Sequence, residues 1–190
     1  ELAMPTLIAH DPRDPFHVPY PWRDAPKDAP IKIAFSRDDF GFGLHPEVAM
    51  ALDKAASALS NAGYAVSEVE PPMAFEVGQA GYRALLGEVK ALMGPDIETH
   101  GSDIVKATFD SRFEFFPPYE GIELLQAMAK RSYYGRAWAM VFEDYPLRLS
   151  PFMLKPFFRP GRDVEGSDGA RDTLGEAQWS FGVNFIGVPA

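Results

Sequence analysis

The residues of this sequence that could carry out hydrolytic chemistry are its serines and paired carboxylates, and their spacings are incomplete. Gln178-Trp-Ser-Phe-Gly182 holds only the second half of the Gly-x-Ser-x-Gly elbow that exposes a nucleophilic serine, and it lies on a helical pattern without a sharp turn. Gly101-Ser102-Asp103 is typical of a helix N-cap. In Asp38-Asp39 and Glu143-Asp144 the carboxylates are consecutive, so their side chains diverge and form no facing acid–base pair. Taken alone, these residues predict no complete active site.

The spacing of glycines and histidines also disfavours a nucleotide loop and a metal centre. Gly41-Phe42-Gly43 lies between an expected strand and an expected helix, but Pro46 stands where a dinucleotide-binding loop needs a third small residue. A glycine-rich turn is the better interpretation. No histidines pair at zinc-hydrolase spacing, and cysteine is absent, so we expect neither a metal nor a cofactor. The histidines, which we expect to face solvent or cap helices, are His10, His17, His45 and His100.

Composition restricts the class of protein further. The 190 residues are 46% apolar and 24% charged, which is ordinary for a globular chain, and 15 of them are Phe. The formal net charge of −9 disfavours nucleic acid and anionic membranes as partners, because both select basic patches. No apolar run approaches the ~20 residues that span a bilayer, and no secretory signal pattern is present. With cysteine absent, these features predict a cytoplasmic protein that binds neither nucleic acid nor membrane.

The elements that would position a site begin with a strand, a helix and a second strand. Ile31–Ser36 alternates large apolar residues with others, which is a strand pattern. The clearest element is a helix over 46–62, with a proline suited to its first turn and Gly63 as its left-handed stop. Tyr64–Val69 has the pattern of a second short strand. This spacing predicts a βαβ unit with parallel strands.

Two further helices are expected. One covers 74–94 and is ended by Gly94-Pro95, and residues 96–119 are less regular, with short helical possibilities around 101–109. The other is a long helix over about 120–144. We expect its inner, buried stripe to be Ile122, Leu125, Ala129, Tyr133, Ala137 and Met140.

Proline-rich segments and one short apolar triplet complete the organisation. Residues 10–30 hold six prolines and predict an ordered, extended connector. Leu147–Leu149 is a candidate third strand. Ser150–Arg162, with three prolines and three phenylalanines, predicts a loop over or beside a pocket.

Both ends of the sequence suggest a chain that continues beyond them. Glu1–Ala9 has the pattern of the last turns of a longer helix. Near the other end, an amphipathic pattern runs into the apolar string Val183–Val188 without a cap, a polar tail or a turn. Because an unpaired apolar terminus is unusual in a finished domain, we expect this string to lead into a central strand whose neighbours lie outside these residues.

Several of these segments, in order, resemble the second half of an amidase signature enzyme. Residues 1–15 resemble the close of the signature region, and Ile31–Arg37 with Leu44–Val48 resembles the family's next strand and helix. Phe142–Pro151 is similar to a strand of the family in which an aspartate is followed by an aliphatic run and then by threonine-proline. Val183–Ala190 is similar to its Asn-Phe-x-Gly-x-Pro-Ala segment. Order and spacing agree over nearly the whole chain, so the joint match is more specific than any single motif.

The resemblance implies an α/β fold, part of a mixed sheet covered by helices, and cofactor-free hydrolysis of a carboxamide. In that family one serine attacks the carbonyl, a lysine activates it through a second serine, and backbone amides hold the oxyanion. That signature would lie upstream of Glu1, so the resemblance assigns no catalytic residue to this chain. We therefore expect residues 1–190 to be the C-terminal, substrate-pocket portion of an amidase, inactive alone and partnered by the missing N-terminal half.

On the substrate side, the resemblance implies that helices and loops after the signature line the acyl and leaving-group pocket. The candidate substrate-binding residues are Phe152 and Met153, which follow the third expected strand, and Trp179. A core or interface role is the alternative for all three, because buried aromatic residues are commoner than pocket walls. Ser150–Met153 stands where the family often has Thr-Pro-Thr, which is a departure from the pattern.

Functions of another class remain open at this point. The βαβ unit and the Phe-rich loops would also suit a free-standing module that holds a small apolar ligand. A non-catalytic interaction subunit is a further alternative. The expected partners are a small-molecule amide, the N-terminal half of the same enzyme and, as an open question, a second copy of the chain.

Overall fold

The computed structural model describes residues 3–18 and 29–189 of the chain. They fall into two compact units, Glu1–Pro30 and Ile31–Ala190. Within the described residues, no helix has both the length and the apolar character needed to cross a membrane.

The first unit is short and built from local turns. Its helix α1 (Met4–Leu7) is a single turn. After it, Asp11 and Asp14 each accept a backbone N–H from two residues further along, at 2.9 Å, which is the geometry of Asx turns. Residues 10–18 therefore bend where an extended connector was expected, because the two aspartate side chains hold the turns. The expected connector's residues 19–28 lie outside the described residues.

The second unit opens with the expected βαβ arrangement. Strand β1 (Lys32–Phe35) is followed by helix α2 (Pro46–Asn61) and strand β2 (Ala65–Glu68), and the two strands pair in parallel, Lys32 opposite Ala65. The imidazole of His45 accepts the N–H of Glu47 at 3.2 Å and so caps α2, as its place before the first-turn proline suggested. The sequence prediction is confirmed here.

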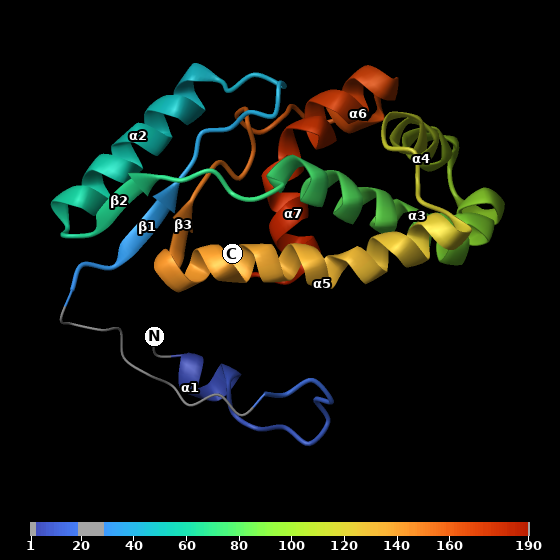
Figure 1. Cartoon of the computed structure of the whole chain (residues 1–190). Coiled ribbons are helices and arrows are strands. Elements are labelled where there is room, and N and C mark those ends of the chain that lie inside the picture. Colours follow the sequence, from blue (N-terminus) through green and yellow to red (C-terminus); the bar gives the residue numbers. More distant parts are fainter. Residues whose placement is uncertain (1–2, 19–28, 190) are drawn as a thin grey trace. The chain divides into compact units, whose positions relative to one another are not determined.

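A third strand completes the sheet. Strand β3 (Leu147–Leu149) pairs in parallel with the other edge of β1, Ile33 opposite Leu147, giving the order β2-β1-β3 (Figure 1). Helices and a small parallel sheet agree with the predicted α/β class. Every strand in the described part of the chain is parallel, so the mixed sheet that the resemblance implies stays a prediction.

The glycine-rich segment between β1 and α2 is a turn, as expected. Gly41 and Gly43 have φ of +80° and +86°, values that suit glycine, and the N–H of Phe42 donates to Asp39 O at 2.9 Å. The segment thus has a local structural reason for its glycines.

One helix end and one additional helix differ from the sequence prediction. Helix α3 (Ala74–His100) continues through Pro95, where a stop was expected, and ends at Gly101. A proline removes one backbone donor from a helix without preventing the turns that follow it, and Thr99 Oγ1 donates to Pro95 O at 2.8 Å. The segment expected to be irregular contains a further helix, α4 (Asp103–Phe115), whose N-cap Ser102 accepts the N–H of Val105.

Helix α5 (Gly121–Asp144) has the expected bounds but buries a different face. Its buried residues are Ala127, Tyr134 and Trp138. The stripe predicted to face inward is largely exposed, and four of its members are 61–67% exposed: Ile122, Leu125, Tyr133 and Met140. The prediction failed because α5 carries apolar residues on two faces, and periodicity alone does not say which of them meets the core.

The C-terminal part is helical and ends in a cap. After the 3₁₀ turn Arg162–Val164 come α6 (Gly166–Leu174), the 3₁₀ turn Gly175–Ala177 and α7 (Gln178–Ile186).

Gly187 closes α7. Its φ is +78°, and its N–H and that of Val188 both reach Val183 O, at 3.0 and 3.1 Å. The expectation of an uncapped apolar end is therefore wrong, because Gly187 supplies the left-handed residue. The strand expected to follow stays a prediction.

The core of the second unit is organised by the contact of α3 with α7. All three clusters of buried side chains include residues of α3, and α7 packs on each of them. The two helices come close through glycines: a Cβ on Gly78 would lie 2.7 Å from Gln178 O, and one on Gly81 would lie 2.5 Å from Phe185 Cβ. Gly182 lies at the same crossing on the α7 side, beside Gly78 N.

Adding one methyl group at this crossing should destabilise the fold. We expect Gly81→Ala to lower the free energy of unfolding by about 1–2 kcal/mol, because the overpacking cost exceeds the gain in helix propensity. Gly135→Ala in α5 is the matched control: nothing lies within 4 Å of its Cβ, so it should raise stability by about 0.5–1 kcal/mol. Urea unfolding of both variants checks the difference. Equal effects of the two substitutions would contradict the close crossing.

Candidate substrate pocket

A cavity of about 540 Å³ lies along the outer edge of β3, between the end of α5 and α7, and we call it the sheet-edge cavity. Its walls are mostly aromatic and aliphatic, with few polar groups. The lining residues that matter for its chemistry are Trp138, Phe142, Arg148, Phe152, Trp179 and Ser180.

The loop that follows β3 is fixed to the rest of the fold at Leu154. This residue is fully buried, its N–H donates to Glu176 O at 3.1 Å, and its O accepts the N–H of His45 at 2.9 Å. Lys155 pairs with the buried carboxylate of Glu176 at 2.5 Å. Burial raises the pKa of Glu176, and the Lys155 ammonium partly offsets the rise. The loop expected over 150–162 is thus present and anchored beside a cavity.

The three predicted substrate-binding residues are distributed over two cavities. Phe152 is 72% exposed and lines the sheet-edge cavity, and its O accepts the Ser180 hydroxyl at 2.8 Å. Trp179 lines the same cavity but is 3% exposed, and its ring N–H donates to Asp38 O at 2.9 Å. Met153 lines a different cavity, of about 450 Å³, against α2. Phe152 lines both cavities, so it meets Trp179 in one and Met153 in the other, and Met153 and Trp179 share neither.

Arg148 is the one cation among the described residues that line the sheet-edge cavity. Its guanidinium carbon lies 4.7 Å from the ring centre of Trp179 and 5.6 Å from that of Trp138, within cation–π range of both. Its Nη1 reaches Val69 O only at 3.5 Å. Its Nε and Nη2 are buried and have no hydrogen-bond partner in the described part of the chain.

The electrostatics of Arg148 follow from this burial. Removal from water lowers the pKa of the Arg148 guanidinium to about 10, and the carboxylate of Glu70 opposes that shift. Glu70 acts from a distance, and its own carboxylate accepts the Ser36 hydroxyl at 3.1 Å. The cavity therefore holds a partly buried cation whose two buried donors, Nε and Nη2, are unused, which costs free energy.

Sequence reasoning missed Arg148 and Trp138 as cavity residues. A signal for Arg148 was present, because a charged residue between two leucines in a strand expected to be aliphatic is unusual. Trp138 gave no such signal, since it lies on the face of α5 that the periodicity did not select.

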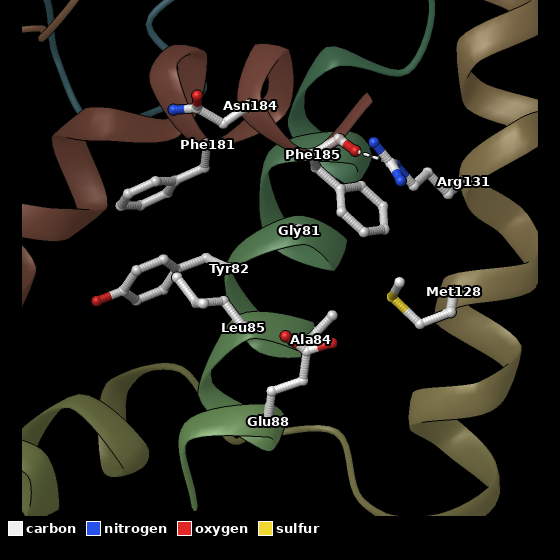
Figure 2. A pocket seen from close by; sticks show the side chains of 10 residues that line it. All are labelled: Gly81, Tyr82, Ala84, Leu85, Glu88, Met128, Arg131, Phe181, Asn184 and Phe185. Atoms are coloured by element: carbon white, nitrogen blue, oxygen red, sulfur yellow. Dashed lines mark hydrogen bonds between the residues drawn. The ribbon is translucent and has the colours of Figure 1, made fainter. Parts of the chain in front are cut away.

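A second cavity, of about 430 Å³, lies among α3, α5 and α7 (Figure 2), and we call it the helix cavity. Tyr82 stacks on Phe181 with ring centres 4.1 Å apart, and Arg131 donates to Phe185 O across it. On its open side are Leu85 and Met128, which are 50% and 40% exposed. The helix cavity is continuous with the exposed apolar face of α5, since Met128 follows Leu125 by one helical turn.

Comparison with known proteins gives the family. The sequence model of the Amidase family matches residues 1–190, so the chain belongs to that family. Indoleacetamide hydrolase of Bradyrhizobium japonicum is 29% identical over 199 residues, covering 99% of this chain and 41% of that protein. A glutamyl-tRNA(Gln) amidotransferase subunit of Moorella thermoacetica is 24% identical over 216 residues, covering 100% of this chain and 44% of that protein.

A shorter match is to the corresponding amidotransferase subunit of Picosynechococcus, 33% identical over 89 residues that cover 43% of this chain and 18% of that protein. The chain thus spans less than half the length of these curated relatives. The family resemblance of the sequence is confirmed.

Removing the partly buried cation of Arg148 should stabilise the protein. We expect Arg148→Met to raise the free energy of unfolding by about 1 kcal/mol at pH 7, because the cost of unpaired buried donors exceeds the lost cation–π energy. The folded-state pKa lies below the unfolded one, so the penalty is present below about pH 10 and fades as pH rises through it. The stability advantage of Arg148→Met should shrink over that range in thermal melts. A destabilised variant at pH 7 would contradict the unpaired state of Arg148.

Proposed function

We propose that this chain is the C-terminal, substrate-pocket portion of an enzyme that hydrolyses a carboxamide C–N bond. The observation that carries the proposal is the Amidase family match over all 190 residues. The catalytic serines and lysine would then come from polypeptide outside these 190 residues. The Bradyrhizobium relative of this chain is more than twice as long as the chain. We also retain the cytoplasm as the proposed location, supported by the absence of cysteine.

The serines within the chain are consistent with this division of roles. Nucleophilic catalysis requires a serine hydroxyl within hydrogen-bond reach of its activating group. In residues 3–18 and 29–189 no serine hydroxyl is hydrogen-bonded to a lysine. Ser36 instead donates to Glu70, Ser167 to Glu114 and Ser180 to Phe152 O. These serines have structural partners, which supports a catalytic centre elsewhere.

The sheet-edge cavity supports a small substrate with a planar apolar acyl group. Phe152 and Trp179 would form aromatic walls for it, as the sequence hypothesis placed them. The activity for which the Bradyrhizobium relative is named, indoleacetamide hydrolysis, is of this chemical kind. A small arylalkyl carboxamide is therefore the substrate class we propose.

The exposed apolar face of α5 and the helix cavity support docking of the rest of the polypeptide. Leu125, Tyr133 and Met140 lie on one stripe of α5 and are each more than 60% exposed. Exposed apolar patches of this kind mark interaction sites. We propose that the N-terminal half of the enzyme covers this stripe.

A non-catalytic subunit is the second candidate. Two of the relatives are named as subunits of an amidotransferase, so proteins of this kind assemble with others. The exposed stripe of α5 would then meet a different polypeptide.

Residues 1–190 alone should not hydrolyse amides. Purified protein incubated with phenylacetamide should release no ammonia above the background, because the proposed nucleophile and its base are not part of it. If ammonia is released, replacing all serines by alanine decides the mechanism: activity that survives would rule out serine catalysis.

Charged residues introduced on the exposed stripe of α5 should disrupt docking of the N-terminal half without affecting the folding of this chain. We expect Leu125→Glu and Met140→Glu to change the free energy of unfolding of this chain by less than about 0.5 kcal/mol, because both side chains are exposed. In the whole enzyme the same changes should abolish soluble, active protein, because they bury a charge. Ala127→Glu, on the buried face, is the control that should unfold even the isolated chain. Full activity of the whole enzyme with both charges would refute the docking proposal.

A further inference from the structure

Arg148 has an unused recognition edge at the wall of an apolar cavity. The two donors without partners among the described residues, Nε and Nη2, lie on the same edge of the guanidinium. This is the edge that carboxylates bind side-on with two nearly parallel hydrogen bonds.

The same chain shows how that edge is used when a carboxylate is near. Arg13 donates from Nε and Nη2 to Asp11, at 3.0 and 2.6 Å. Arg162 donates from the same two nitrogens to a single oxygen of Asp172, Oδ2, at 2.9 and 2.5 Å. In Arg148 the described residues leave this edge empty, although its two nitrogens are buried, and burial makes a missing partner more costly than at the surface.

We propose that Arg148, within cation–π range of Trp138 and Trp179, binds the carboxylate of a small aromatic acid in the sheet-edge cavity. The two indole rings attract the guanidinium, and the apolar walls at Phe142 and Phe152 accept the aromatic part of the ligand. Low local polarity strengthens a charge-assisted pair once it forms. No other cationic side chain lines this cavity in the described part of the chain.

Access to the edge requires a rotation of the guanidinium, because Nε and Nη2 have almost no water-accessible surface. The hydrogen bond that opposes the rotation, Nη1 to Val69 O, is 3.5 Å long and therefore weak. The carboxylate would replace it with two short bonds, while the cation–π contact with Trp179 is kept.

This inference rests on the proposed function for the source of the acid. An amide hydrolase makes a carboxylate from its substrate, so the bound group is either the acid product or a second acidic group on the substrate. Phenylacetate represents the first source and 4-(carbamoylmethyl)benzoate the second. Phenylacetamide is the neutral probe that matches both in size.

The test is calorimetric titration of purified protein with these three probes. We expect at least one of the two acids to bind, and phenylacetamide to bind at least about ten-fold more weakly. Arg148→Met and Arg148→Gln should each weaken acid binding by about 10- to 100-fold. Arg148→Lys should also lose most of it, because an ammonium lacks the two-donor edge. Which acid binds identifies the source.

Two controls make the result specific to Arg148. Arg171→Met removes the same charge from the exposed surface of α6 and should leave acid binding unchanged. Glu70→Gln removes the carboxylate that opposes the pKa shift of Arg148 and should bind the acid at least as tightly as the parent protein. If Arg148→Met and Glu70→Gln lose acid binding equally, Arg148 affects binding only through its interaction with Glu70. That result would overturn the proposal.

Other outcomes are equally decisive. If neither acid binds to a protein that melts cooperatively, the carboxylate site does not exist, whatever the enzyme's turnover. If an acid binds through Arg148 but the whole enzyme hydrolyses no amide, the site stands and the proposed function fails.

Discussion

The close crossing of α3 and α7 is the constraint on which the rest of the second unit depends. Gly78 and Gly81 let the α7 backbone approach so closely that a single added Cβ would overlap it. Trp179 is then placed against the turn after β1, and Phe181 and Phe185 pack on α3. Through its bond to Phe152, Ser180 fixes the loop after β3 to the same helix. One glycine-mediated contact thus positions much of the core and the α7 wall of the sheet-edge cavity.

Local signals made β1, α2 and β3 predictable from the sequence. The alternation in Ile31–Ser36, the proline and glycine that bound α2, and the leucine pair of β3 each act over a few residues, and the structure has all three elements where these signals place them. The predictions for Pro95 and α5 failed for a different reason. Whether a helix resumes after a proline, and which of two apolar faces it buries, depends on its neighbours in space.

The candidate site was predictable only in part for the same reason. Phe152 and Trp179 lie 27 residues apart in sequence and meet at one cavity because α7 folds back onto the β3 loop. Met153 follows Phe152 directly and shares a second cavity with it, but it does not line the cavity that Trp179 lines. The role of Arg148 depends on two tryptophans from different helices, which no sequence spacing reveals.

The order of the strands has a consequence for synthesis on the ribosome. β1 pairs with β2 soon after both emerge, but its other edge waits for β3, which follows more than a hundred residues later. Contacts between such distant segments form slowly, and an unpaired edge invites pairing with other chains in the meantime. The nascent protein therefore has a long interval in which a chaperone, or early packing of α3, must shield that edge.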